Sequence, residues 1–218
     1  MKKIFQLLLA AAILALIYVI YIQISTPIQF EKEMTAKSNA VIERIKDVRS
    51  AERAFKTVNA RFTADFDSLI NFVLNDSLTM QRKRVDEDDS IGMAKFKLAQ
   101  KRDKTLKNVE EFKVAVIDTI FSPRKLTPEQ VAKLRFIPGT DDKTEFILSA
   151  GVVTTESKVV IPVVECKAPY IYFLDTVVYR QAIINKNDDL MNNYNMYPGI
   201  KFGSMEGGNN EAGNWTGE

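Results

Sequence analysis

The feature that most constrains the fold is an apolar run close to the N-terminus. No charged residue occurs from Ile4 to Ile24. Because a helix rises about 1.5 Å per residue, the run reaches roughly 30 Å, the thickness of the hydrocarbon core of a bilayer. Leu14 lies near its middle, and Tyr18 and Tyr21 lie where phenol rings can reach the lipid headgroups. The run predicts a transmembrane anchor over residues 1–26.

Two lysines, Lys2 and Lys3, precede the apolar run. Basic residues stay on the cytoplasmic side, so we expect a single-pass protein of the cytoplasmic (inner) membrane with its N-terminus inside and the rest periplasmic. The alternative is a cleaved signal peptide, whose apolar part is usually about 7–15 residues long. The run is longer, and no small-x-small cleavage site follows it cleanly. We therefore expect the segment to be retained.

An amphipathic helical pattern follows over residues 27–62, with Pro27 predicted to mark a break or kink. Apolar residues recur every seven positions on an otherwise charged helix, as a single stripe. We expect Val48–Phe62 to pack on its own head, and Met34–Ile45, which is closer to the bilayer, to pack on neighbouring copies. The predicted interface residues are Met34, Val41, Ile45, Val48 and Phe55.

Charged pairs are predicted on the solvent side of the same helix. Glu33 precedes Lys37, and Glu52 precedes Lys56, by four residues. Glutamate and lysine at this spacing face each other across one helical turn. Both glutamates are therefore expected to be exposed and paired.

Composition excludes several function classes. The 218 residues include 30 basic and 28 acidic ones, a formal charge of +2, which offers no electrostatic argument for nucleic-acid binding. Histidine is absent, which removes the commonest general base and metal ligand. The single cysteine, Cys166, cannot form an internal disulfide. An enzyme would need paired carboxylates or a Ser–Lys arrangement, and no spacing singles one out, so we expect no enzymatic activity.

The remaining residues, 63–218, predict an extracytoplasmic α+β head. A capped helix is expected around residues 66–73, a mobile arm or charged surface helix at 91–107, and a helix over 176–191. Strand patterns occur at 79–85, 112–116, 145–154, 158–164, 170–174 and 200–202, with a helix over 109–120 as the alternative to the second of these. The pair 145–154 and 158–164 predicts a hairpin, with Pro162 indicating an edge or a bulge. The fold class is thus α+β: a long N-terminal helix, then a head with a small antiparallel sheet and short helices.

This order of elements resembles that of type IV pilins and the pseudopilins of type II secretion. Residues 51–63 are similar to the stalk end of the major pseudopilin, where an Asn-Gly-Arg-Tyr-Pro-Thr-like turn follows alanine and an aromatic. Ala60 stands in place of that glycine and Phe62 in place of the tyrosine. Residues 202–215, ending in Gly-Asn-Trp, resemble the terminal loop of the family, which commonly holds calcium.

The chain also departs from that family. It has neither a cleavage-site glycine before the apolar run nor a glutamate within it. The resemblance implies a weak calcium candidate in the terminal loop, to which backbone carbonyls or Asp188 and Asp189 would have to contribute, because calcium takes six to eight oxygens. A plain surface loop without any cofactor is the alternative. The candidate ligands are Glu206, Asn209, Asn210 and Glu211.

Two functions of different classes follow. The first is a membrane-anchored, pseudopilin-like structural subunit of an envelope secretion or pilus-type assembly, which associates with copies of itself or with other subunits through its stalk. The second is a bitopic sensor or binding module whose head captures a ligand or an envelope protein. The second predicts a pocket lined by Tyr170, Tyr172, Tyr194 and Tyr197.

Overall fold

The computed structural model describes residues 2–122 and 124–215 and has the expected α+β class. A long N-terminal helix is followed by short helices and two small antiparallel sheets. The chain divides into two compact units. One unit contains the chain up to Arg49 together with the chain from Leu134 onward, and the other contains Ser50–Lys133.

Helix α1 (Lys2–Asn59) is continuous and includes Pro27. The expected break is therefore absent, although a proline removes one backbone hydrogen bond from the helix. Beside it, the Gln29 amide Nε2 donates to Ser25 Oγ over 3.1 Å. The helix contains the one segment, among the described residues, that is long and apolar enough to cross a membrane. Every residue from Ile4 to Ile24 is exposed, so no part of the described chain covers this segment.

The first unit contains a three-stranded sheet of order β3-β4-β5. The predicted hairpin is confirmed, because β3 (Ile147–Thr154) pairs antiparallel with β4 (Val160–Pro169). On its other side β4 pairs with β5 (Gly199–Gly203), but only from Glu165 onward. Pro162 therefore lies in the part of β4 whose second side is free of a neighbouring strand, which is where a proline is tolerated.

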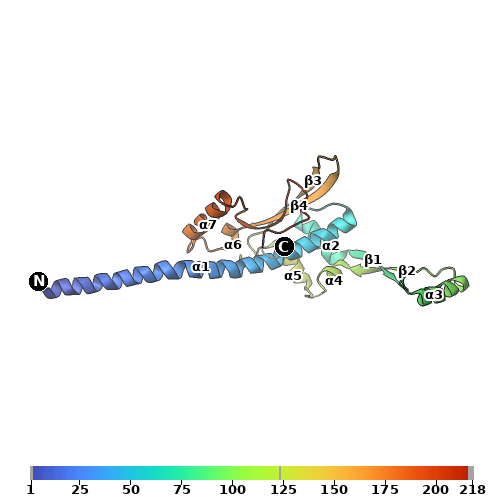
Figure 1. Ribbon diagram of the computed structural model, residues 1–218, viewed down its shortest axis with the longest axis horizontal. Coiled ribbons are helices and arrows are strands. Elements are labelled where there is room, and N and C mark those ends of the chain that lie inside the picture. Colours follow the sequence, from blue (N-terminus) through green and yellow to red (C-terminus); the bar gives the residue numbers. More distant parts are fainter. Residues whose placement is uncertain (1, 123, 216–218) are drawn as a thin grey trace. The chain divides into compact units, whose positions relative to one another are not determined.

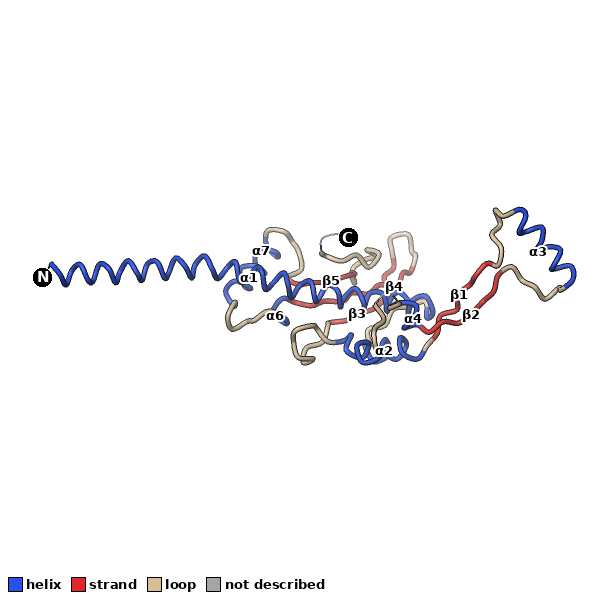
Figure 2. Tube along the Cα trace, turned by 90° about the horizontal axis from the view of Figure 1, so that it is seen from below, coloured by secondary structure: helices blue, strands red, loops and turns tan. Residues whose placement is uncertain are grey.

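The core of this unit lies between one face of the sheet and α1. On β4 the side chains of Val164, Cys166 and Ala168 alternate into the buried face. Cys166 and Ala168 oppose Phe202 and Ile200 of β5, which are also buried. Figures 1 and 2 both show the sheet running along α1, whose residues in this stretch include three with no exposed surface: Val41, Ile45 and Val48.

Two helices complete the first unit. The prediction of a strand at residues 170–174 is wrong, because this segment forms the short helix α6 (Tyr170–Phe173). Phe173 and Leu174 are both buried. A strand would point these adjacent side chains to opposite faces, whereas a helical turn directs both inward. The predicted helix at 176–191 is confirmed as α7 (Arg180–Asn192).

The second unit contains the end of α1 and six short elements. The predicted helix at 66–73 is confirmed, and its N-cap is Asp65, whose carboxylate accepts from the backbone N–H groups of Asp67 and Ser68. A 3₁₀ turn, η1 (Lys133–Arg135), follows α5 (Pro128–Ala132), the last helix of this unit. The elements are α2 (Phe66–Asn75), β1 (Ser77–Lys83), α3 (Ser90–Arg102), β2 (Val109–Ala115), α4 (Val116–Ile120) and α5 (Pro128–Ala132).

Residues 77–115 of this unit form what we call the arm. Strands β1 and β2 pair antiparallel along their whole length, from Ser77 opposite Ala115 to Lys83 opposite Val109. They lead away from α2 and α4 to helix α3 at the tip (Figure 2). Helix α3 has no buried residue. The surface helix predicted at 91–107 is thus present, carried on a two-stranded ribbon.

The tight approach of β5 to β4 depends on Gly203. Its φ is +76°, and a Cβ at this position would lie 1.9 Å from the carbonyl oxygen of Val164. We expect Gly203→Ala to lower the free energy of unfolding by at least about 2 kcal/mol, since the left-handed backbone alone costs about 1–2 kcal/mol. Gly207→Ala is the matched control: nothing lies within 4 Å of its Cβ position, so a change within about 0.5 kcal/mol is expected. Urea unfolding of both variants measures the difference, and equal stabilities would contradict the argument.

Candidate functional site

The surface of α1 is the candidate site, and it has two halves. The predicted membrane residues all lie in the bare half and are fully exposed on the single chain: Ile4, Leu14, Tyr18, Tyr21 and Ile24. An apolar surface of this extent is typical of contact with lipid or with another apolar helix. Burial by the chain's own residues begins further along, at Phe30.

The predicted interface residues lie in the covered half. Val41, Ile45 and Val48 have no exposed surface, Phe55 is buried, and Met34 is half-buried. Their own chain therefore covers the stripe, including the Val41 and Ile45 side chains that we expected to face neighbouring copies. The expectation must be corrected for these two residues, because the first unit covers α1 closer to the apolar run than the seven-residue spacing could indicate.

The contact between the head and α1 that lies nearest the apolar run is made by two aromatic rings. The rings of Phe30 and Tyr179 lie 5.4 Å apart at a tilt of 52°. Burial, followed by the nearby Glu33 carboxylate, raises the pKa of Tyr179. Glu33 also forms the predicted i,i+4 ion pair with Lys37, at 2.7 Å. The head thus contacts α1 within two turns of the end of the apolar run.

At the end of the stalk, the backbone has the left-handed conformation that would suit the glycine of the pseudopilin turn to which residues 51–63 are similar. Helix α1 ends at Asn59, and the next residue, Ala60, has a φ of +55° while its N–H donates to Lys56 over 2.8 Å. This left-handed residue just after a helix is a position where glycine is preferred. Within the same stretch, the Phe55 ring meets Phe72 of α2 edge-on at 5.2 Å.

Glu52 is the residue that the sequence interpretation placed wrongly. Its side chain is fully buried rather than exposed and paired with Lys56. One carboxylate oxygen, Oε2, accepts from the Thr63 backbone N–H over 3.2 Å, and the other has no hydrogen-bond partner among the described residues. Burial raises the pKa of Glu52 to about 8, against the smaller lowering effect of the Thr63 N–H. The carboxyl is therefore mostly protonated at neutral pH.

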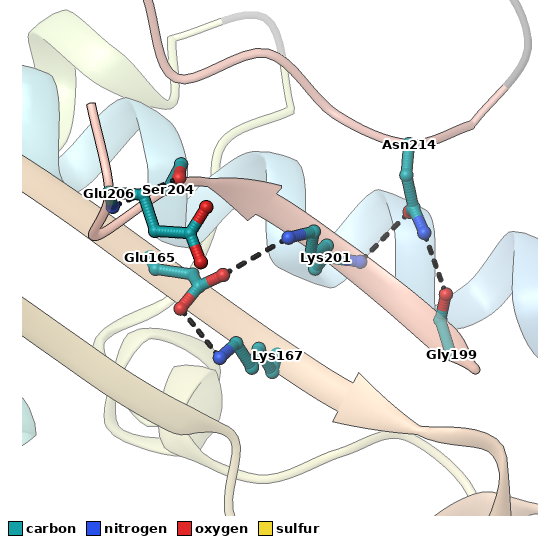
Figure 3. Close-up of polar contacts among 7 residues, drawn as sticks. All are labelled: Glu165, Lys167, Gly199, Lys201, Ser204, Glu206 and Asn214. Atoms are coloured by element: carbon teal, nitrogen blue, oxygen red, sulfur yellow. Dashed lines mark hydrogen bonds and ion pairs between the residues drawn. The ribbon is translucent and has the colours of Figure 1, made fainter. Parts of the chain in front are cut away.

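The terminal loop holds α1 and the sheet together within the first unit. Asn214 extends the edge of β5: its Oδ1 accepts from Lys201 N–H at 2.9 Å and its Nδ2 donates to Gly199 O at 2.8 Å (Figure 3). The next residue, Trp215, is buried, and the Arg49 guanidinium of α1 lies 5.3 Å from its ring. The Gly-Asn-Trp motif is therefore a structural clasp.

The candidate calcium ligands lie in the turn before this clasp. Asn210 and Glu211 have positive φ angles, and Glu206 N–H donates to Ser204 Oγ over 3.2 Å. Within the described part of the chain, no group of three His, Cys, Asp or Glu side chains could hold a metal ion. Calcium prefers six to eight oxygens, so a site here would need ligands besides the two glutamates. Calcium binding by Glu206, Asn209, Asn210 and Glu211 stays a prediction.

A buried carboxylate with two lysines lies on the other face of the sheet and was missed from the sequence. Glu165 accepts from Lys167 Nζ at 2.6 Å and from Lys201 Nζ at 3.2 Å (Figure 3). The two lysines oppose each other directly in the β4–β5 ladder, where like charges are destabilising. Glu165 offsets that repulsion. Burial and then the Glu165 charge raise the pKa of the neighbouring Tyr197 to about 12. The available signal was the alternation Glu-x-Lys directly after the strand predicted at 158–164.

The four tyrosines expected to line a sensor pocket lie outside the buried core, and a pocket formed by them stays a prediction. Tyr170 and Tyr197 are half-buried, and the Tyr170 ring contacts Phe173 at 5.7 Å. Tyr172 and Tyr194 are exposed.

Comparison of the chain with protein-family models, curated proteins and solved structures found no match. The resemblance to pseudopilins therefore rests on residues 51–63 and 202–215 and on the order of the elements.

Titration of Glu52 predicts how stability depends on pH. Its carboxyl has an ordinary pKa of 4.5 in the unfolded chain and about 8 in the folded chain. Between these values the folded chain binds more protons, so the free energy of unfolding falls as pH rises, by at most about 1.4 kcal/mol per pH unit. We expect Glu52→Gln to remove this slope, because the amide oxygen keeps the Thr63 hydrogen bond without a charge. Urea unfolding between pH 5 and 9 measures it, with exposed Glu43→Gln as the control. An unchanged slope in Glu52→Gln would contradict the assignment.

The conformation of Ala60 predicts a stabilising substitution. Ala60→Gly should raise the free energy of unfolding by about 1 kcal/mol, because glycine adopts the left-handed conformation without strain. Ala64→Gly is the matched control, at an exposed position without a positive φ. There the extra freedom of the unfolded chain should make the effect neutral or destabilising. The same urea experiment compares them, and equal effects would argue against strain at Ala60.

Proposed function

We propose that the chain is a membrane-anchored, pseudopilin-like structural subunit of an envelope secretion or pilus-type assembly. The observation that carries the proposal is the division of α1, a single helix with a bare apolar half and a half buried in its own chain. The apolar half would lie in the cytoplasmic membrane. Lys2 and Lys3 would hold the N-terminus inside, so that the head lies in the periplasm.

Two further features support the pseudopilin-like interpretation. Ala60 has the left-handed conformation that suits the glycine of the family's stalk end. Trp215 and Asn214 form a clasp that joins the terminal loop to α1 and to the edge of β5. Both features lie in the two stretches on which the resemblance rests, and both have structural rather than chemical roles. No enzymatic activity is part of the proposal.

The proposed mode of association differs from the one that the stripe suggested. Val41 and Ile45 are covered by their own chain and are not available to a neighbouring copy. The exposed large apolar side chains of α1 lie between Ile4 and Ile28, apart from Val58 near the end of the helix. Helices in a bilayer associate through close van der Waals packing rather than through the hydrophobic effect. We therefore place the contact with copies of itself or with other subunits inside the membrane.

A second candidate function, a bitopic binding module that captures an envelope protein, is favoured by the arm. Ile91 and Leu98 of α3 are 70% and 62% exposed and occur seven residues apart, hence on one face. Lys95, between them in the sequence, and Arg102 share this face. An isolated two-stranded ribbon is only marginally stable in water, so an arm of this kind gains by binding a partner. Its surface suits an acidic protein with an apolar groove.

Cysteine cross-linking distinguishes the two candidates. In a Cys166→Ala background, single cysteines are placed at each position from Ile13 to Leu16, which covers one turn of the membrane helix, and separately at Leu98. Oxidation in native membranes should give disulfide-linked dimers, or adducts with other subunits, from at least one of the four membrane positions. The chain is then extracted and sized by electrophoresis without reductant.

The controls separate the outcomes. Val160, exposed on β4, provides the matched cysteine position at which no cross-link is expected. Cross-links at Leu98 alone would favour the binding module and reject association through the membrane helix. Recovery of the chain in the soluble fraction after membranes are sedimented would reject both, because both need the anchor.

A further inference from the structure

We propose that the turn between α6 and α7, residues 175–179, is a second point of membrane contact, with Val177 and Val178 inserted among the lipid headgroups. The inference rests on the proposed anchoring of α1 and adds a lipid-binding surface on the head. The occupant of this surface is the outer face of the same bilayer that α1 crosses. All of the residues that carry the argument belong to the first unit.

The side chains of this turn are unusually exposed. Val177 is 91% exposed and its neighbour Val178 is 63% exposed. Burying a valine side chain is worth about 1.5–3 kcal/mol relative to leaving it in water. The apolar surface continues beside the turn into an open groove lined in part by Ile171 and Ile184, both exposed. Adjacent exposed apolar residues of this kind mark an interaction surface.

The turn presents these valines in a fixed conformation. The Asp175 carboxylate oxygen Oδ1 accepts from the backbone N–H groups of Val177, at 2.8 Å, and Val178, at 3.0 Å. The Tyr179 N–H donates to Asp175 O at 3.0 Å. Those two bonds to the carboxylate lower the pKa of Asp175, so it stays ionised at neutral pH. The backbone polar groups are thereby satisfied within the turn while the apolar side chains point outward.

The height of the turn along α1 is set by Tyr179. Its ring packs on Phe30, which lies six residues, or about 9 Å, beyond Ile24. The headgroup layer extends about 5–8 Å beyond each side of the hydrocarbon core. Within the first unit, Figures 1 and 2 both show the α6–α7 turn close to the bare half of α1. For a membrane around residues 4–24, the outer edge of the headgroup layer therefore lies roughly one residue short of Phe30, next to the turn that Tyr179 holds against it.

The composition of the turn suits insertion into headgroups rather than electrostatic attachment. Tyrosine is enriched at this level of a bilayer, and an arginine can extend its charge toward phosphates, as Arg180 could. The charged side chains that act on the turn or adjoin it balance: Lys37 and Arg180 against Glu33 and Asp175. The contact should therefore depend on apolar burial, with little requirement for anionic lipid.

Fluorescence in vesicles tests this proposal. The full chain carrying Cys166→Ala and Val177→Cys is labelled with an environment-sensitive fluorophore and reconstituted, at one chain per vesicle, in phosphatidylcholine. We expect a blue-shifted emission that lipids with a nitroxide near the headgroup quench. Adding Val178→Asp should reduce the quenching to the level of the control, and adding anionic lipid should leave it unchanged.

Val160→Cys is the matched control. This residue is 61% exposed, like Val178, but lies at the opposite end of β4 from α6. Its label should show neither shift nor quenching. A label at Leu14, quenched by nitroxides deep in the bilayer, reports the anchor separately.

Each other outcome overturns the proposal. If Leu14 is quenched and position 177 is not, α1 is anchored and the turn lies away from the lipid. If neither is quenched, the anchor itself and the proposed function fail as well. If position 177 shifts only when vesicles contain several chains, the valines contact another copy rather than lipid.

Discussion

The whole structure depends on the burial of one stripe of α1 by its own chain. From Val41 to Val48 the helix contributes apolar side chains with no exposed surface, and each such side chain is worth about 1.5–3 kcal/mol when removed from water. The sheet offers a single apolar face in return, and the terminal loop closes over Arg49 with Trp215. Because α1 is continuous through Pro27, the contacts that hold its buried half also orient its exposed apolar half.

The periodicity of the sequence determined the helix and its buried side but not the surface that covers it. A spacing of seven shows that Val41 and Ile45 are hidden, and it is equally compatible with their own head and with a neighbouring copy. Which surface covers the stripe depends on contacts such as the one between Phe30 and Tyr179. These residues are 149 positions apart, and no sequence pattern links them. The pairing of strands was predictable from alternation, whereas the short apolar segment at Tyr170 fits a strand or a helix equally.

The two buried glutamates show why polar sites are harder to predict than the core. Glu165 lies between two lysines, Lys167 and Lys201, and forms an ion pair with each. Glu52 meets a single N–H from Thr63, and burial raises its pKa until the proton stays on. In the sequence both are glutamates four or fewer residues from a lysine. Only the fold distinguishes them, because one lies on a sheet face open to long basic side chains and the other lies under the end of a helix.

The missing membrane glutamate gives the α6–α7 turn a role in the proposed assembly. In the family that this chain resembles, a glutamate in the membrane segment packs against the amino terminus of a neighbouring copy and thereby sets the relative height of the two. This chain has no charged residue between Ile4 and Ile24 that could do so. If Val177 and Val178 rest among the headgroups, every copy has the same height above the same bilayer. Neighbouring α1 helices are then in register before they meet, and the contact between them needs no buried charge to define it.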